Sequence, residues 1–420
     1  MTASSSVPPA GTRTRRRDQI LTSAAQLFAT TGYTKTSMRD VAAASGILAG
    51  SLYHHFESKE AIAVELVENY YADLVVAVQK FGSVDADPLT ALRLFTTEIA
   101  ELSFQHQAAL QIRMFDAPSA ASSSLKTVIH AAPASLNRQW RTLIGAAVAA
   151  GAISPDIDPR LLRYVLYRVT MQAGLLAWLG QPSGGTRNIT DCITTIIFDG
   201  LAGQPPGYED ESVATAVVNE AKARWEADAA ERLASRRGAV LAIAREQFAL
   251  RGFESTTMRD IADAAGLTAS NLYRYFESKD SMVVEILADF SDRLLAAYKE
   301  VIGAGSTVTM SLDAILWLLE QAGRQFGPEI EILQGYGRLV ALGLGDHYEQ
   351  GAQARLALLA QLIDTGVTAG EFRQVAGPEL VATCVREIMW SAMRDLASVS
   401  PLRARKFFRH TVLSGAAAVR

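Results

Sequence analysis

Residues 36–62 read TSMRDVAAASGILAGSLYHHFESKEAI, and residues 256–282 read TTMRDIADAAGLTASNLYRYFESKDSM. The two stretches align without a gap at a constant offset of 220 residues. The same offset relates three earlier residues, Arg17, Phe28 and Gly32, to Arg237, Phe248 and Gly252. Solenoid repeats recur every ~20–50 residues, so a period of about half of this 420-residue chain indicates two copies of a whole domain.

The bulk composition is that of a globular protein. Hydrophobic residues make up 49% of the chain and charged residues 20%. No apolar run approaches the ~18 residues of a membrane span, and the polar residues 1–11 lack the apolar segment of a signal peptide. The two cysteines, Cys192 and Cys384, do not share the repeat offset. We therefore expect small core residues in a reducing cytoplasm, with no disulfide and no metal cluster.

The net charge of −4 argues against a general polyanion binder, so any affinity for nucleic acid must come from local basic patches. Such patches stand just before each repeat. They consist of Arg13, Arg15, Arg16 and Arg17, and of Arg232, Arg236 and Arg237. A solvated helix start would look similar, but the recurrence at both repeats favours a binding role.

Each repeat predicts four helices in the same order. Apolar residues recur at helical spacing over residues 17–31, and Gly32 ends that helix. Thr36 and its neighbour are N-cap types that begin a short second helix, which Gly46 ends. A third short helix follows, and Ser58 caps a longer fourth one. Two short helices joined by a tight turn that contains glycine describe a helix-turn-helix, whose second helix can enter a major groove.

The candidate DNA-binding residues follow from that geometry. Small outward residues on the third helix let it approach base edges, while basic residues, hydroxyls and helix N-termini suit phosphates. In copy one the candidates are Arg15, Arg16, Thr36, Ser37, Ala49, Gly50, Ser51, Tyr53, His54 and Lys59. In copy two they are Arg237, Thr256, Thr257, Ala269, Ser270, Asn271, Tyr273, Arg274 and Lys279.

The motif that carries a family resemblance is Asp40-Val41-Ala42, Gly46 and Leu52-Tyr53-His54-His55-Phe56 with Ser58-Lys59. It closely resembles the DNA-binding segment of the TetR family of bacterial one-component regulators, and it occurs twice. Copy two departs from the pattern at Tyr275, which stands where copy one has His55. That difference puts the base preference of copy two in doubt.

The resemblance implies an all-α fold made of two tandem TetR-like units. Each unit is expected to hold an N-terminal helix-turn-helix domain and a helical ligand-binding and dimerisation domain, and together they form an intramolecular pseudo-dimer. The expected domains are a disordered tail (1–12), helix-turn-helix domain 1 (13–60), helical domain 1 (61–201), a linker with a strut helix (202–236), helix-turn-helix domain 2 (237–280) and helical domain 2 (281–420). We call residues 13–201 copy one and residues 237–420 copy two.

Several helices are expected outside the two motifs. Terminal pairs at 158–179 with 187–201, and at 378–397 with 401–418, each supply half of a four-helix bundle within one chain. Residues 122–150 predict one long helix. Residues 212–236 contain neither proline nor glycine, and we expect this strut to run on into the first helix of copy two. Trp225 favours packing of the strut on copy one, and a solvated linker helix is the alternative.

The resemblance also implies a repressor that a small apolar ligand releases from double-stranded operator DNA. The 46–56 run of copy one resembles a branch that regulates steroid or fatty-acyl catabolism, which suggests an acyl-CoA or lipid-like effector. Pocket candidates are Phe95, Ile99, Leu102, Arg113, Met114, Trp140, Trp317, Phe326 and Tyr336, each of which also suits a plain core.

Other functions remain as alternatives. A ligand-independent architectural DNA-binding protein and a transcriptional activator both fit the motif, and two chains can still associate further. No H-E-x-x-H, P-loop, nucleophile-elbow or C-x-x-C motif favours an enzyme. The adjacent His54 and His55 point ~100° apart on a helix, so they do not favour a shared metal ion. We expect no cofactor and no membrane partner.

Overall fold

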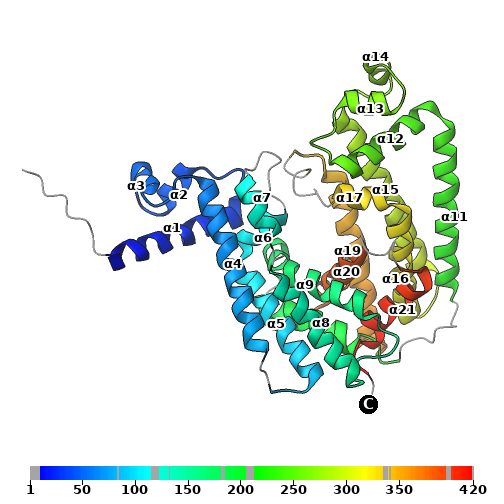
Figure 1. Cartoon of the computed structure of the whole chain (residues 1–420). Coiled ribbons are helices and arrows are strands. Elements are labelled where there is room, and N and C mark those ends of the chain that lie inside the picture. Colours follow the sequence, from blue (N-terminus) through cyan, green and yellow to red (C-terminus); the bar gives the residue numbers. More distant parts are fainter. Residues whose placement is uncertain are drawn as a thin grey trace, which may run out of the picture. The chain divides into compact units, whose positions relative to one another are not determined.

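The computed structural model describes residues 10–82, 85–114, 123–131, 133–180, 185–204, 212–333, 339, 342–393 and 399–418. Figure 1 shows that the chain is built of helices, and no strand occurs in the described ranges, only two isolated bridges. None of the helices among these residues is long and apolar enough to cross a membrane. The all-α fold predicted from the sequence is therefore correct.

The first six helices of copy one recur in the same order in copy two, where an extra helix precedes them. The helices of copy one are α1 (Ala10–Thr31), α2 (Met38–Ala44), α3 (Ala49–Tyr53), α4 (Lys59–Phe81), α5 (Pro88–Gln105), α6 (Gln107–Met114), α7 (Ser123–His130), α8 (Ala134–Ala149), α9 (Pro159–Gly180) and α10 (Gly185–Asp199). The rest of the chain forms α11 (Val213–Ala234), α12 (Arg236–Arg251), α13 (Met258–Ala264), α14 (Ala269–Tyr273), α15 (Lys279–Gly303), α16 (Val308–Gln325), α17 (Gly327–Leu333), α19 (Asp346–Thr368), α20 (Pro378–Ala392), α21 (Pro401–Arg409) and the π-helical turn η2 (His410–Ser414).

The long helix expected over residues 122–150 is in fact two helices. α7 ends at His130 and α8 begins at Ala134. Pro133 lies between them. Proline has no backbone N–H and disfavours helical geometry in the residue before it, so the helix cannot pass through this point.

The chain folds into two compact units, which do not coincide with the two sequence copies. The first unit comprises Met1–Ala86, Leu94–Thr142 and Thr170–Thr186. The second comprises Asp87–Arg93, Leu143–Val169 and Arg187–Arg420. The second unit therefore holds all of copy two together with three segments of copy one, residues 87–93, 143–169 and 187–201.

The core of the first unit is aromatic around α4 and α5. Phe95 packs its ring edge-on against Trp140, with ring centroids 4.7 Å apart, and also against Phe81 at 5.3 Å. The hydroxyl of Tyr70 donates to the sulfur of Met171 at 2.9 Å. The hydroxyl of Tyr71 donates to the carbonyl of Ile129 at 2.9 Å. Buried hydroxyls with partners avoid the cost of unpaired polar groups, so α4 is held firmly in this core.

In the second unit, the end of copy one pairs with the end of copy two by reciprocal backbone hydrogen bonds. The amide of Leu201 donates to the carbonyl of Val412 at 2.9 Å, and the amide of Ala416 donates to the carbonyl of Ile197 at 2.7 Å. Both the donors and the acceptors are related by the same offset of 215 residues. Such an exchange is the signature of a two-fold interface, here formed inside one chain.

Three further reciprocal pairs complete this contact, which we call the terminal clasp (residues 152–154, 197–203, 371–373 and 412–418). In the first pair, the amide of Ala202 donates to the carbonyl of Leu413, and that of Ala417 donates to Phe198. In the second pair, the amide of Gly203 donates to the carbonyl of Glu371, and that of Ala418 donates to Ala152. In the third pair, the amide of Arg373 donates to the carbonyl of Leu201, and that of Ser154 donates to Ala416. The backbones touch so closely at Gly200 that a Cβ there would lie 2.3 Å from the carbonyl oxygen of Leu413.

The strut helix α11 packs against copy two, along α15 and α16 (Figure 1). Trp225 is 4% exposed, and its ring lies 5.1 Å from that of Phe326. Ion pairs add to this contact: Arg232 with Asp289 at 2.5 Å, Arg293 with Asp228 at 2.5 Å, and Arg224 with Glu300. The expectation that this helix packs was right, but the surface against which it packs is that of copy two.

The strut does not run on into the next helix as the sequence predicted. It ends at Ala234, and the side chain of Ser235 accepts a hydrogen bond from the amide of Gly238 at 3.0 Å as the N-cap of α12. A Cβ on Gly238 would lie 2.1 Å from the carbonyl oxygen of Arg232. Glycine at this position therefore permits the sharp corner between α11 and α12.

Candidate DNA-binding surfaces

Both helix-turn-helix motifs are complete and share the same internal bonds. The turn between their short helices uses a glycine with positive φ, Gly46 at +64° and Gly266 at +62°. After each glycine an amide closes the turn: Ile47 donates to Ala42 at 3.0 Å, and the equivalent Leu267 donates at 2.9 Å. Only glycine adopts this backbone region at little cost, so the residue fixes the angle between the short helices.

A capping box begins the first short helix of each motif. Ser37 and Asp40 exchange side-chain and backbone hydrogen bonds at the start of α2, as Thr257 and Asp260 do at the start of α13. The side-chain hydrogen bond from the capping hydroxyl lowers the pKa of each aspartate below its usual value, and the backbone bond lowers it further. Ser37 and Thr257 are exposed, so the first amides of α2 and α13 begin at the protein surface.

Lys59 holds the turn between α1 and α2, an internal role that the sequence did not indicate, and its contact with a phosphate stays a prediction. Its ammonium donates to the carbonyls of Tyr33 at 2.7 Å and Thr36 at 2.8 Å, and more weakly to that of Thr34. It also lies 4.4 Å from the centre of the Tyr33 ring. Lys279 makes the equivalent bonds in copy two. These three carbonyls match the three donors of an ammonium.

Arg237, Thr256 and Thr36 also have internal roles that the sequence did not indicate. Arg237 forms a two-pronged ion pair with Glu285, both bonds at 2.6 Å, and that hydrogen bonding raises its pKa. The hydroxyls of Thr36 and Thr256 are buried and donate to the carbonyls four residues earlier at 2.8 and 2.9 Å. The phosphate contacts expected of these three side chains stay predictions beside these internal bonds.

The outward face of α3 and α14 stays exposed, as the motif predicted. Tyr53 and Tyr273 are each 55% exposed, while Leu52 and Leu272 on the opposite face are fully buried. The other exposed candidates on these helices and their ends are Gly50, Ser51 and His54 in copy one, and Ala269, Ser270, Asn271 and Arg274 in copy two; Ala49 is half-buried.

Leu48 is a surface residue that the sequence reasoning missed. It is 80% exposed at the start of α3 and makes no side-chain cap, whereas the equivalent Thr268 caps α14 by accepting from the amide of Asn271 at 3.3 Å. The signal was present in the sequence, because a leucine stands at a position where N-caps are usually polar. An exposed aliphatic side chain at this point of a recognition helix can contact a thymine methyl group.

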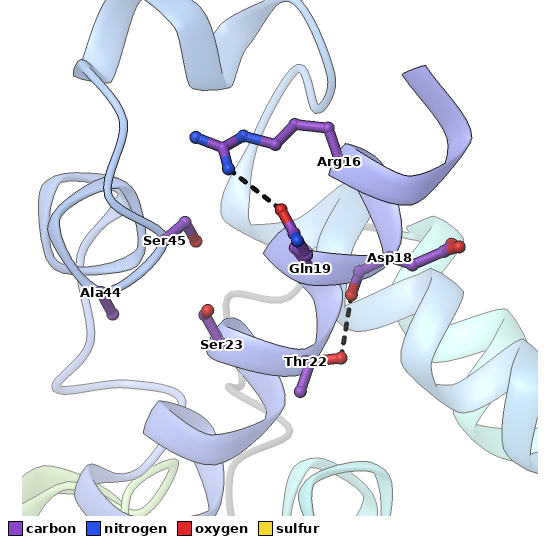
Figure 2. Close-up of a pocket in the computed structure, with 7 residues that line it drawn as sticks. All are labelled: Arg16, Asp18, Gln19, Thr22, Ser23, Ala44 and Ser45. Atoms are coloured by element: carbon purple, nitrogen blue, oxygen red, sulfur yellow. Dashed lines mark hydrogen bonds between the residues drawn. The ribbon is translucent and has the colours of Figure 1, made fainter. Parts of the chain in front are cut away.

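Arg16 borders an open hollow between α1 and the end of α2 (Figure 2). Its guanidinium donates to the side chain of Gln19 at 3.0 Å and, at 3.4 Å, to the carbonyl of Gly46. Asp18, Thr22 and Ser45 are among the other residues that line the hollow. Arg15 is exposed on the same helix. Arg16 thus lies beside the turn of the first helix-turn-helix.

The pocket candidates are only partly gathered by the structure. Phe95, Ile99 and Trp140 are fully buried in the first unit, and the indole N–H of Trp140 has no hydrogen-bond partner among the described residues. Leu102 on α5 and Arg113 on α6 are half-buried in the same unit. Trp317, in the second unit, is also half-buried. Phe326 is buried against the strut helix. Tyr336 and the side chain of Met114 lie outside the described part of the chain.

Comparison with known proteins identifies both motifs. The family described as "Bacterial regulatory proteins, tetR family" matches residues 20–66 and 240–286. The HTH-type transcriptional repressor KstR2 of Mycolicibacterium smegmatis (strain ATCC 700084 / mc(2)155) is 32% identical over 174 residues, which are 41% of this chain and 85% of that protein. KstR2 of Rhodococcus jostii (strain RHA1) is 35% identical over 160 residues, 38% of this chain and 78% of that protein.

One solved structure that resembles this chain covers less than half of it. The ketosteroid transcriptional regulator KstR2 of Mycobacterium tuberculosis is 29% identical and covers 42% of this chain and 90% of its own, with a TM-score of 0.39. The similarity to the KstR2 repressors lies in copy one, while the family's DNA-binding segment occurs in both copies. The chain therefore belongs to the TetR family of DNA-binding transcriptional regulators, as two tandemly fused copies.

Proposed function

We propose that the chain is a cytoplasmic repressor that binds operator DNA through α3 and α14 and leaves it when a small apolar effector binds. The observation that carries this proposal is the presence of two complete helix-turn-helix motifs with the same internal bonds. Neither motif has lost its glycine turn, its capping box or its lysine tie. The names of the relatives support repression over activation.

One chain would act as the counterpart of an ordinary regulator dimer. The terminal clasp supports this part of the proposal, because its reciprocal bonds join backbone groups at the end of copy one to backbone groups at the end of copy two. Sedimentation of the free protein tests it. We expect the mass of one chain, and an obligate homodimer would contradict the intramolecular pseudo-dimer.

The effector would enter the aromatic core of copy one. Phe95 and Trp140 supply the apolar surface, and the unpaired N–H of Trp140 offers a hydrogen-bond donor inside it. Because Tyr70 and Tyr71 tie α4 to this core, a ligand there would shift α4 and with it α3. DNA and ligand would then oppose each other through one coupling free energy. Resemblance to the steroid and fatty-acyl branch suggests an acyl-CoA or lipid-like molecule.

The test measures DNA binding and transcription together. Duplexes selected from a random pool by the full chain should block transcription when they are placed in a promoter. Oleoyl-CoA should release the complex and change the fluorescence of the protein's tryptophans, while coenzyme A alone should do neither. Increased transcription would indicate an activator, and tight binding without any preferred sequence would indicate an architectural protein.

A further inference from the structure

The two recognition helices are displayed equally within their own copies. In each, the tyrosine at the end of the helix is 55% exposed, and the leucine before it is fully buried. The guanidinium of Arg17 lies 4.2 Å from the centre of the Phe56 ring, and that of the equivalent Arg237 lies 4.3 Å from the centre of the Phe276 ring. A difference in DNA reading between the copies must therefore come from the exposed side chains and not from the supporting scaffold.

Four exposed positions on the recognition helices and their ends carry different side chains in the two copies, whereas the exposed Tyr53 and Tyr273 are alike. Copy one offers Leu48, Gly50, Ser51 and His54, and copy two offers Thr268, Ser270, Asn271 and Arg274. Asparagine can pair with two atoms of adenine, and arginine can pair with two atoms of guanine. Glycine reads no base, and leucine suits a thymine methyl group. The two helices therefore present different chemistry to a major groove.

A single chain of this protein differs from a homodimer in the recognition helices that it carries. A homodimer presents two identical helices, so its two-fold symmetry requires a palindromic operator. Here the clasp joins the end of copy one to the end of copy two within one chain, through eight backbone hydrogen bonds. Each molecule therefore always carries one α3 and one α14.

We propose that the operator consists of two unlike half-sites, one read by α3 and the other by α14. The α14 half-site is expected to carry a guanine opposite Arg274 and an adenine opposite Asn271. The α3 half-site is expected to carry thymine methyl groups beside Leu48. This inference rests on the proposed function, since it requires that the chain binds operator DNA with both copies.

Selection of random duplexes by the full chain tests the inference directly. We expect a non-palindromic consensus with two different conserved blocks. The Arg274→Ala variant should bind this site about 5- to 150-fold more weakly, which corresponds to about 1–3 kcal/mol, and should relax base preference within one block only. The His54→Ala variant should relax positions in the other block only. Both side chains are exposed, and circular dichroism checks that the variants fold.

Exchanging the exposed residues provides a matched control. A copy-one variant that carries Leu48→Thr, Gly50→Ser, Ser51→Asn and His54→Arg presents the side chains of copy two at both helices. We expect this variant to select a palindrome made of two α14 half-sites. The reciprocal variant, with Thr268→Leu, Ser270→Gly, Asn271→Ser and Arg274→His, should select a palindrome of two α3 half-sites.

The possible failures separate this inference from the proposed function. If the native chain enriches no sequence, the proposed sequence-specific function itself is wrong. If the native chain selects a true palindrome, or if His54→Ala and Arg274→Ala relax the same positions, DNA binding stands but the two unlike half-sites do not.

Discussion

At the scale of single residues, Lys59 and Lys279 show how a surface position can conceal an internal role. A lysine beside a recognition helix suggests a phosphate contact, and nothing in the linear sequence excludes it. In the fold, each ammonium donates to three carbonyls of the turn that joins the first two helices. The charge therefore stabilises the motif that carries the recognition helix.

We predict that Lys59→Met lowers the free energy of unfolding of the motif and leaves the salt dependence of DNA binding nearly unchanged. Methionine keeps much of the side-chain volume but leaves the three carbonyls without their donor, at a cost of about 1–3 kcal/mol. Hydrogen exchange at the amides of α2 and α3 should speed up, and urea should unfold the variant at lower concentration.

Arg15→Ala is the matched control, because Arg15 is exposed. It should leave unfolding unchanged and reduce the slope of log affinity against log salt by about one unit. If Lys59→Met behaves in this way instead, with unchanged stability, then the lysine does contact a phosphate.

At the scale of elements, the strut α11 shows where helical patterning stops being informative. The apolar spacing predicted a helix over residues 212–236 and one buried face, and α11 spans Val213–Ala234 with Trp225 buried. The pattern carried no information about the partner. Shape and charge decide which surface α11 packs against, because α15 presents Asp289, Arg293 and Glu300 to the basic and acidic side chains of α11.

We predict that Trp225→Ala destabilises the second unit by about 3–5 kcal/mol, because it removes a large buried ring that packs against Phe326. Thermal unfolding measures this effect. Leu233→Ala, on the same helix but 57% exposed, is the control and should change stability by less than about 0.5 kcal/mol. Equal effects of the two changes would mean that α11 is only a solvated linker.

At the scale of the whole molecule, the terminal clasp joins the ends of the two copies within the second unit. The sequence offered two pairs of terminal helices but could not show whether they associate within one chain or between two. In the second unit, the donors and acceptors at the end of copy one bond with those at the end of copy two. Gly200 adopts a φ of +71° at the point of closest approach, where a side chain cannot fit.

We predict that Gly200→Ala opens the clasp. The added Cβ would overlap the carbonyl of Leu413 and occupy a backbone region that alanine avoids, which together cost at least about 1–3 kcal/mol. The melting temperature should fall, and sedimentation should detect chains that associate through their released ends. Gly203→Ala is the control, because its Cβ would lie 3.7 Å from the nearest atom, an ordinary contact. An unchanged Gly200→Ala protein would show that the clasp contributes nothing to assembly.

The sequence by itself determined the repeat, the all-α class and both helix-turn-helix motifs. These depend on local rules, namely apolar spacing, N-caps and glycine turns, which act over a few residues and are visible in linear order. Only the tertiary structure decided that Lys59 and Arg237 bond to groups within their own copies and that α11 packs on copy two. It also decided that the ends of the two copies exchange reciprocal hydrogen bonds. Each of these depends on atoms that are close in space but distant in sequence, and linear spacing does not specify such long-range contacts.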